Sequence, residues 1–205
     1  MIEAAQDTEK AILKAATRLF LEKGFKATST TEIAKEAGCN QAMVHYYFRT
    51  KDRLFEAVFA DKFQGFVSSI MDISKGDLPF EEKLTEKIGA HFDMLLRNPK
   101  LPLLFAYELN TNPKRLEAIK EKLGDLPAMV FANFQEELDR EIEKGTIRKM
   151  KVIDLLFSII ALNMALFIIG PVLKEFSGIS DEYYEGFVKH RKKENVNTIL
   201  RSLRP

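Results

Sequence analysis

The chain has 205 residues, 46% of them hydrophobic, and its Lys and Arg residues outnumber its Asp and Glu residues by one. This length can bury an apolar core without staples, and the single cysteine, Cys39, excludes a disulfide framework or a multi-cysteine zinc site. The near-zero net charge excludes a general attraction to polyanions, so any binding to nucleic acid must come from a local surface. The start, MIEAAQDTEK, lacks the pattern of a signal peptide, and we expect a cytoplasmic protein.

Residues 1–53 carry the signals of three helices. The first is predicted from an apolar stripe with helical spacing and ends at Gly24; the stripe contains Ile12, Ala15, Ala16, Leu19 and Phe20. Ser29 to Glu32 form a capping box that starts a short second helix, which Gly38 ends. A third helix is predicted from Asn40, with Val44, Tyr47 and Phe48 on its buried side, and Thr50 is a candidate N-cap for a long fourth helix.

The remaining pattern is also helical, with prolines at expected first turns. Pro79, Pro102 and Pro127 begin three further helices, and a very apolar helix covers roughly 152–170, where Pro171 kinks or restarts it. A last helix is predicted from Ser180 to about Leu203. We find no alternating strand pattern and no internal repeat. The sequence therefore predicts an all-α chain of about nine helices.

The two short helices around the turn 38–40 have the spacing of a helix-turn-helix, which places its second helix in the DNA major groove. A Gln side chain there can pair with adenine, and small or apolar side chains can contact the thymine methyl group. We also expect the Lys51 ammonium group to meet a phosphate. Residues 1–53 carry a net charge of +2 and the rest −1, a mild asymmetry in the same direction.

Several spaced motifs occur in order between residues 8 and 55, namely Gly24-Phe25, Ser29–Ala34, Ala37-Gly38 and Val44–Leu54. Together they resemble the N-terminal region of the tetracycline-repressor (TetR/AcrR) family of bacterial regulators. The resemblance implies a helix-turn-helix DNA-binding domain over 1–52, followed by a helical effector-binding and dimerisation domain over 53–205. It further implies a homodimer on double-stranded DNA with a palindromic operator, and regulation by a small-molecule effector. No cofactor or metal is expected.

The resemblance also assigns contacts to individual positions. Base edges would be contacted by Gln41, Ala42, Met43 and Tyr46, and phosphates by Thr30, His45, Tyr47 and Lys51, with Thr31 near the groove edge. The chain departs from the family pattern at three of its positions: His45 replaces a usual tyrosine, Cys39 a usual valine, and Ala42 a frequent glycine. A histidine can still donate to a phosphate oxygen, and its contact would be sensitive to pH.

The uncharged stretch 155–173 has the length of a membrane-spanning helix. We expect a core and dimer helix instead, because Ser158 and Asn163 lie inside the stretch and Gly170-Pro171 interrupts it. By the resemblance, this helix and the last one would form a four-helix bundle with a second copy. The predicted dimer interface consists of Leu156, Ile160, Phe167, Phe187, Val196, Ile199 and Leu200.

Aromatic and Met side chains on the later helices could line an apolar pocket for a small apolar or amphipathic effector. Taken singly, each is more often plain core. The candidates are Phe63, Phe66, Phe92, Met94, Phe105, Tyr107, Phe131, Phe134, Met164 and Phe167, with Glu108, His91 and Asn163 as the orienting polar groups.

Two other classes of function compete with a ligand-responsive repressor. A helical ligand-binding or scaffold protein without a DNA role fits the same hairpin. An enzyme is disfavoured, because none of His45, His91 and His190 lies in an H-E-x-x-H arrangement, and the chain has no G-x-S-x-G, P-loop or G-x-G-x-x-G motif.

Overall fold

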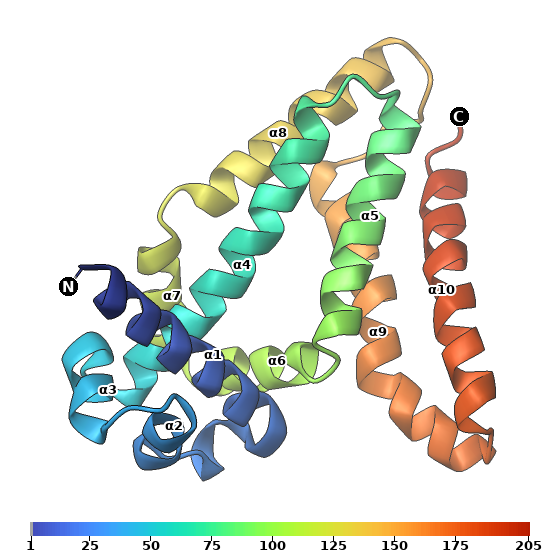
Figure 1. Ribbon diagram of the computed structural model, residues 1–205. Helices are drawn as coiled ribbons and strands as arrows, with labels where there is room; N and C mark the ends of the chain where they lie inside the picture. Colours follow the sequence, from blue (N-terminus) through green and yellow to red (C-terminus); the bar gives the residue numbers. More distant parts are fainter. Residues whose placement is uncertain (1) are drawn as a thin grey trace. The chain divides into compact units, whose positions relative to one another are not determined.

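The structure, a computed structural model, describes residues 2–205, with side chains from residue 7 onward (Figure 1). The described residues form ten helices and no strand, which confirms the all-α prediction. The helices are α1 (Ile2–Ala27), α2 (Thr30–Glu36), α3 (Gln41–Phe48), α4 (Lys51–Lys75), α5 (Phe80–Arg97), α6 (Leu101–Thr111), α7 (Pro113–Leu123), α8 (Leu126–Glu143), α9 (Val152–Ser177) and α10 (Asp181–Ser202). The helix that the sequence did not predict is α7.

The chain divides into two compact units. Unit 1 comprises the residues up to Gln64 together with Leu103–Gly124, and unit 2 comprises Gly65–Pro102 and Asp125–Pro205. Unit 1 therefore includes α7 and most of α6 in addition to the three N-terminal helices. The expected functional division between residues 52 and 53 stays a prediction, and these compact units follow the packing instead.

Local hydrogen bonds explain the helix limits in unit 1. Gly24 breaks the regular course of α1 with φ 81°, a conformation that side chains with a Cβ rarely adopt. The capping box at the start of α2 is present in both directions between Ser29 and Glu32. Asn40 caps α3 by accepting from the Met43 amide, and the Thr50 hydroxyl accepts from the Arg53 amide at the start of α4. The predicted caps at Ser29 and Thr50 are confirmed, and the cap at Asn40 lies where the third helix was predicted to begin.

Unit 1 closes on an aromatic centre. The rings of Phe20, Phe25 and Phe55 lie 5.4–5.6 Å apart, centre to centre, which is the spacing of favourable edge contacts. Ile33 of α2 and Val44 of α3 are buried in the same core. Both short helices are thereby held to α1 and α4 by one apolar side each.

A buried arginine lies beside this centre. Only 3% of the Arg115 side chain of α7 is exposed, and its guanidinium carbon lies 3.9 Å from the Phe25 ring centre and 4.7 Å from that of Phe55. The guanidinium is paired with Glu108 of α6 and Asp52 of α4. The Glu108 side chain is 7% exposed and the Asp52 side chain 57%, so the pair with Glu108 is the buried one. Arg115 thus joins α6 and α7 to the start of α4.

Unit 2 is built around α5, α9 and α10, which pack against one another, while α8 packs on α9 (Figure 1). One side of α9 is buried there, at Leu155, Ile159 and Leu166. Gly170 has no room for a Cβ, because the Tyr184 hydroxyl of α10 occupies that space. α9 continues through Pro171 to Ser177. No helix therefore ends at this proline, where the sequence predicted a kink or a restart.

Replacing Arg115 by Met is expected to lower the free energy of unfolding by about 3–5 kcal/mol, because it leaves the buried Glu108 carboxylate without its cation. Adding Glu108→Leu should recover most of the loss, since both charges are then replaced by apolar groups. Asp52→Asn, at an exposed partner, should cost less than about 1 kcal/mol. Chemical denaturation measures all three, and equal losses for Arg115→Met and the double variant would contradict this assignment.

Candidate nucleic-acid interface

The exposed face of α3 carries the side chains predicted to read DNA. Gln41, Ala42, His45 and Tyr46 are all exposed, whereas Val44 and Phe48 on the opposite side are buried in the core of unit 1. Tyr46 has 66% of its surface exposed although it is a large aromatic residue. A stable helix that presents polar and aromatic groups outward is the arrangement that major-groove reading needs.

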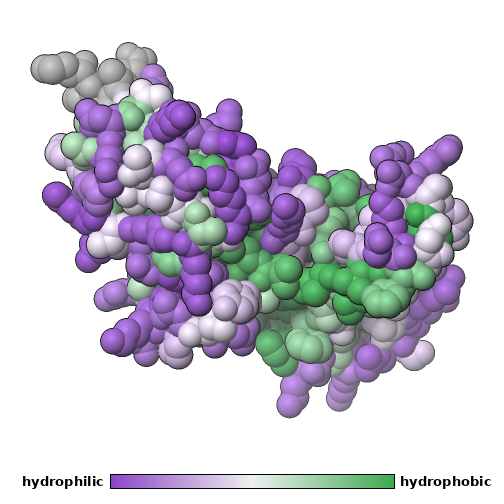
Figure 2. All heavy atoms as spheres, turned by 90° about the horizontal axis from the view of Figure 1, so that it is seen from below, coloured by the Kyte–Doolittle hydropathy of each residue, from purple (hydrophilic) through white to green (hydrophobic). Residues whose placement is uncertain are grey.

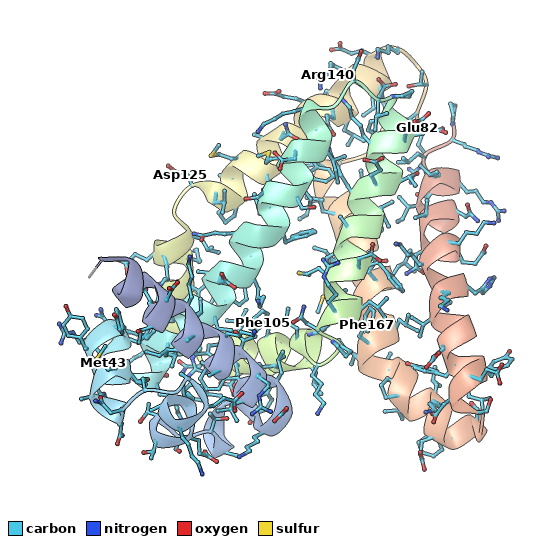
Figure 3. The ribbon with its side chains drawn as sticks, in the orientation of Figure 1. Met43, Glu82, Phe105, Asp125, Arg140 and Phe167 are labelled. Atoms are coloured by element: carbon cyan, nitrogen blue, oxygen red, sulfur yellow. The ribbon has the colours of Figure 1, made fainter. Side chains whose placement is uncertain are left out.

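Met43 and Tyr47, also predicted to contact DNA, lie partly inside. Both are half-buried and pack against the core of unit 1, and Figure 3 shows where Met43 lies on α3. The Tyr46 ring meets the Tyr47 ring edge-on at 5.2 Å, centre to centre. Tyr47 therefore supports Tyr46 in addition to any contact of its own.

The polar groups of this face are linked to α2. The Gln41 Nε2 amino group donates to the Thr30 Oγ1 atom at 3.0 Å and lies 3.5 Å from His45 Nε2. The second ring nitrogen of His45, Nδ1, lies 3.1 Å from the Arg49 carbonyl oxygen. Thr31 is exposed beside Thr30. The structure thus brings Thr30, Gln41 and His45 together in one network.

Lys51 has a different setting from the one predicted. Its ammonium group donates to the carbonyl oxygens of Phe25 and Thr28 at 3.0 and 2.9 Å, and it lies 4.4 Å from the centre of the Phe25 ring. It therefore fixes the segment between α1 and α2, and a phosphate contact remains a prediction for its third N–H group alone.

Sequence reasoning missed four further cations. Within the described residues they are exposed and take part in no ion pair, so they are available to phosphate oxygens: Lys26, Lys35, Arg49 and Arg53. Two other cations of this unit are neutralised locally, because Arg18 pairs with Glu36 and Lys23 with Glu32. The Lys23 ammonium and the Ser29 cap lower the pKa of Glu32 to about 2.

The residues predicted to line an effector pocket are divided between the two units, and the pocket stays a prediction. Phe63, Phe105, Tyr107 and Glu108 belong to unit 1, where Glu108 is paired with Arg115 and the Phe105 ring lies 4.5 Å from that of Phe59. The other candidates belong to unit 2, where Met94 and Met164 are half-buried and Phe131 is exposed. Phe92 packs against Phe167, and Phe134 is part of the main core. Figure 3 labels Phe105 on α6 and Phe167 on α9.

His91 and Asn163, two of the predicted orienting groups, form the centre of a buried polar chain in unit 2. Asn163 donates to His91 Nδ1 and to the Ile88 carbonyl, both at 3.1 Å, and its own oxygen accepts from Asn195. The Phe66 ring lies 5.2 Å from the imidazole. Burial lowers the pKa of His91 to about 4, so the ring is neutral at physiological pH.

One turn before His91, Lys87 is almost fully enclosed. Its side chain is 1% exposed, it pairs with Glu137 of α8, and its nitrogen lies 4.5 Å from the Phe134 ring centre. Burial lowers the pKa of the Lys87 ammonium, and Glu137 opposes that effect. Sequence reasoning missed this pair, which had no local signal because α5 and α8 supply one partner each.

An open hollow of about 540 Å³ lies at the start of α9 and is lined by Arg148, Lys149, Met150, Lys151 and Asp154. It shares no residue with the predicted pocket. No group of three or more His, Cys, Asp or Glu side chains in the described part of the chain could hold a metal ion.

α9 also carries exposed apolar side chains outside its buried side. They are Ile153, Phe157, Ile160, Ile169, Val172, Leu173 and Phe176. Figure 2 shows hydrophobic surface gathered on the side where α9 lies, while the part near the N-terminus is mostly hydrophilic. By length and composition α9 could also cross a membrane, and it is the one helix in the described residues that passes this test.

The predicted interface residues are distributed unevenly over this region. Ile160 is exposed, whereas Leu156, Phe167, Phe187, Val196 and Leu200 are half-buried. Ile199 must be removed from the interface, because it lies in the core of unit 2 with 2% of its surface exposed. Phe157 and Phe176, which are 72% and 87% exposed, were not among the predicted residues.

The fold and the exposed face of α3 define a helix-turn-helix protein with a separate helical unit. The family model described as "Bacterial regulatory proteins, tetR family" matches residues 12–58. This match, the similar proteins and the solved structures of similar fold all indicate a TetR/AcrR family transcriptional regulator.

Individual relatives agree with this assignment. The Fatty acid metabolism regulator protein of Bacillus subtilis is 24% identical over 138 residues, which are 67% of this chain and 70% of the relative. The HTH-type transcriptional repressor NicS of Pseudomonas putida is 28% identical over 106 residues, 52% of this chain and 50% of the repressor. The solved structure of the fatty acid degradation regulator FadR from Bacillus halodurans has a TM-score of 0.69 at 22% identity, covering 92% of this chain and 94% of that one. Proteins that resemble this chain are transcriptional regulators, a non-enzymatic role.

Stability should depend on pH through His91. The folded-state pKa of about 4 lies below the ordinary value of 6.5, so the unfolded chain takes up the proton first. The contribution of neutral His91 to the free energy of unfolding is complete above about pH 6.5. It is lost as the pH falls toward 4, and the total loss is about 3 kcal/mol. His91→Gln keeps an acceptor for Asn163 and should remove this dependence. Denaturant melts between these pH values measure it, and identical pH curves for both proteins would contradict the assignment.

Proposed function

We propose that this chain is a ligand-responsive transcriptional repressor that binds a palindromic operator as a homodimer and is released by a small apolar or amphipathic effector. The observation that carries the proposal is the exposed face of α3, whose outward side chains have no packing role in unit 1. The repressor NicS among the relatives supports the direction of control.

The homodimer is supported by the exposed apolar side of α9. A contiguous apolar stripe on a soluble protein marks a surface that another molecule covers. A second copy would cover it with its own α9, because a two-fold axis brings the same patch of both chains together. The proposed interface consists of Phe157, Ile160 and Phe176 with the half-buried Leu156, Val196 and Leu200 at its margin.

Dimerisation matters for DNA binding because one helix makes few base contacts, each worth about 1–3 kcal/mol. Two copies add their contacts on half-sites about 34–36 Å apart. An effector that binds better to a dimer in which the two α3 helices have a different spacing lowers the affinity for the operator. About 1–3 kcal/mol of coupling between effector binding and DNA binding is enough for control.

The nature of the effector follows from the interior of unit 2, where aromatic rings surround few polar groups. Phe66 lies beside His91, and Phe92 packs on Phe167. A pocket opening among these side chains would suit an apolar body with one polar end. The names of two similar proteins refer to fatty acids, which are amphipathic molecules.

DNA binding should be specific and strongly dependent on salt. The affinity for a selected palindrome is expected to exceed that for random duplex by about a thousandfold or more, and to fall with salt at a log–log slope near −0.9 per phosphate neutralised. A salt titration by fluorescence anisotropy measures both quantities. Equal affinity for both duplexes would favour the rival function, a helical ligand-binding or scaffold protein without a DNA role.

A charge placed in the apolar stripe should separate the two copies. Phe157→Glu buries an unpaired carboxylate at the interface and is expected to yield monomers with weakened operator binding. Met129→Glu on α8 is the matched control, since Met129 is also an exposed apolar residue, at 56% exposure, outside the stripe. Sedimentation velocity in detergent-free buffer distinguishes them, and a dimeric Phe157→Glu protein would exclude this interface.

A further inference from the structure

The amide of Gln41 has two protein partners that constrain its direction. Gln41 lies in the first turn of α3, and its Nε2 atom is 3.0 Å from the Thr30 hydroxyl oxygen and 3.5 Å from His45 Nε2. The other ring nitrogen of His45 lies 3.1 Å from the Arg49 carbonyl oxygen. These three contacts form one connected path from a backbone carbonyl to the side chain that faces DNA.

The Arg49 carbonyl determines the direction of the whole path. A carbonyl oxygen can only accept, so Nδ1 of His45 must carry the hydrogen. In a neutral imidazole Nε2 then holds a lone pair and accepts a hydrogen bond. The amino group of Gln41 can donate that bond, whereas its oxygen cannot. The Thr30 hydroxyl can donate or accept and adapts to either choice. With neutral His45, Gln41 therefore presents its Oε1 oxygen outward.

We propose that His45 is a positioning residue that sets, through Gln41, which base α3 reads, and that its protonation reverses the preference. With neutral His45, the outward oxygen pairs with an exocyclic amino group, adenine N6 or cytosine N4. With protonated His45 both ring nitrogens donate, so the amide turns and offers its amino group to acceptors, guanine O6 and N7 or thymine O4. This inference rests on the proposed DNA-binding function.

The effect arises only in the complex. In free protein the exposed amide can turn, because water satisfies whichever group faces outward. At the base edge water is excluded, and a donor left facing a donor costs roughly five- to a hundredfold in affinity. The protonation state of His45 then selects between bases although His45 itself touches none of them.

The carboxylates near α3 have their own partners. On α2, Glu32 is paired with Lys23 and Glu36 with Arg18. At the start of α4, Lys51 is held by backbone carbonyls and Asp52 by Arg115, while Arg49 on the C-terminal side of α3 is exposed. Within the described residues the hydrogen-bond contacts of the His45 ring are those to Gln41 and the Arg49 carbonyl, and no carboxylate is among them.

The test selects duplexes from a pool with a randomised core, once at about pH 8 and once at about pH 5.5, where exposed imidazoles gain a proton. The full-length protein is used, and Gln41→Ala identifies the base pair that Gln41 reads, because its preference is lost there. The readout compares duplexes that differ in the base contacted by Gln41 at that pair. The affinity for adenine or cytosine there, divided by the affinity for guanine or thymine, should fall about tenfold from pH 8 to pH 5.5. The ratio is the readout, because protonation strengthens binding to every duplex.

His45→Phe keeps an aromatic ring at this position and removes both nitrogens, so its base ratio should not change with pH, although it shares every other titrating group with the wild type. An unchanged ratio in the wild type, or an equal change in His45→Phe, overturns the inference while specific binding stands. Failure to enrich any duplex at either pH overturns the DNA-binding proposal itself and the inference with it.

Discussion

The placement of the exposed face of α3 depends on how the short segment from Phe25 to Ser29 is held. The Phe25 ring lies in contact with the cations Lys51 and Arg115, and Lys51 also binds the carbonyl oxygens of Phe25 and Thr28. Because these cations come from the first turn of α4 and from α7, the turn before α2 is tied to two later parts of unit 1. The helix-turn-helix pair is thus part of a larger packed unit that includes helices far along the chain.

The other constraint is the two-sided character of α9. One side is buried in the core of unit 2 and carries Asn163, whose amide connects α5 and α10 through hydrogen bonds. Exposed apolar side chains lie outside that side along most of the helix. A helix that is apolar all round is most stable when both sides are buried. In a single chain, one side of α9 remains exposed to water. The proposed second copy would bury this exposed side and would also supply a second helix-turn-helix for the other half-site.

The features that the sequence predicts well are local ones. The caps at Ser29 and Thr50 depend on residues a few positions apart, and both were found as expected. α7 was missed because its sequence, PKRLEAIKEKL, is mostly charged and follows the polar run 110–112, which reads as a loop.

Long-range pairing could not be predicted. The sequence predicts Lys51 as a free phosphate ligand, but its ammonium group donates to two carbonyl oxygens from residues 23 and 26 positions away. Glu108 and His91 looked like members of one pocket, yet they lie in different units. Ile199 matched a helical interface pattern, but the pattern does not tell which partner covers an apolar side. The exposed α3 face, in contrast, followed directly from the helical period.

The central claim, that two copies joined through α9 read one palindrome, is tested most directly by varying the spacing of the half-sites. Inserting about five base pairs, half a helical turn, at the centre of a selected operator turns the second half-site to the opposite face of the duplex. The account predicts two chains per intact operator and a loss of most of the affinity on insertion. Equal affinity for the intact, expanded and single half-site duplexes, with one chain bound to each half-site independently, would contradict it.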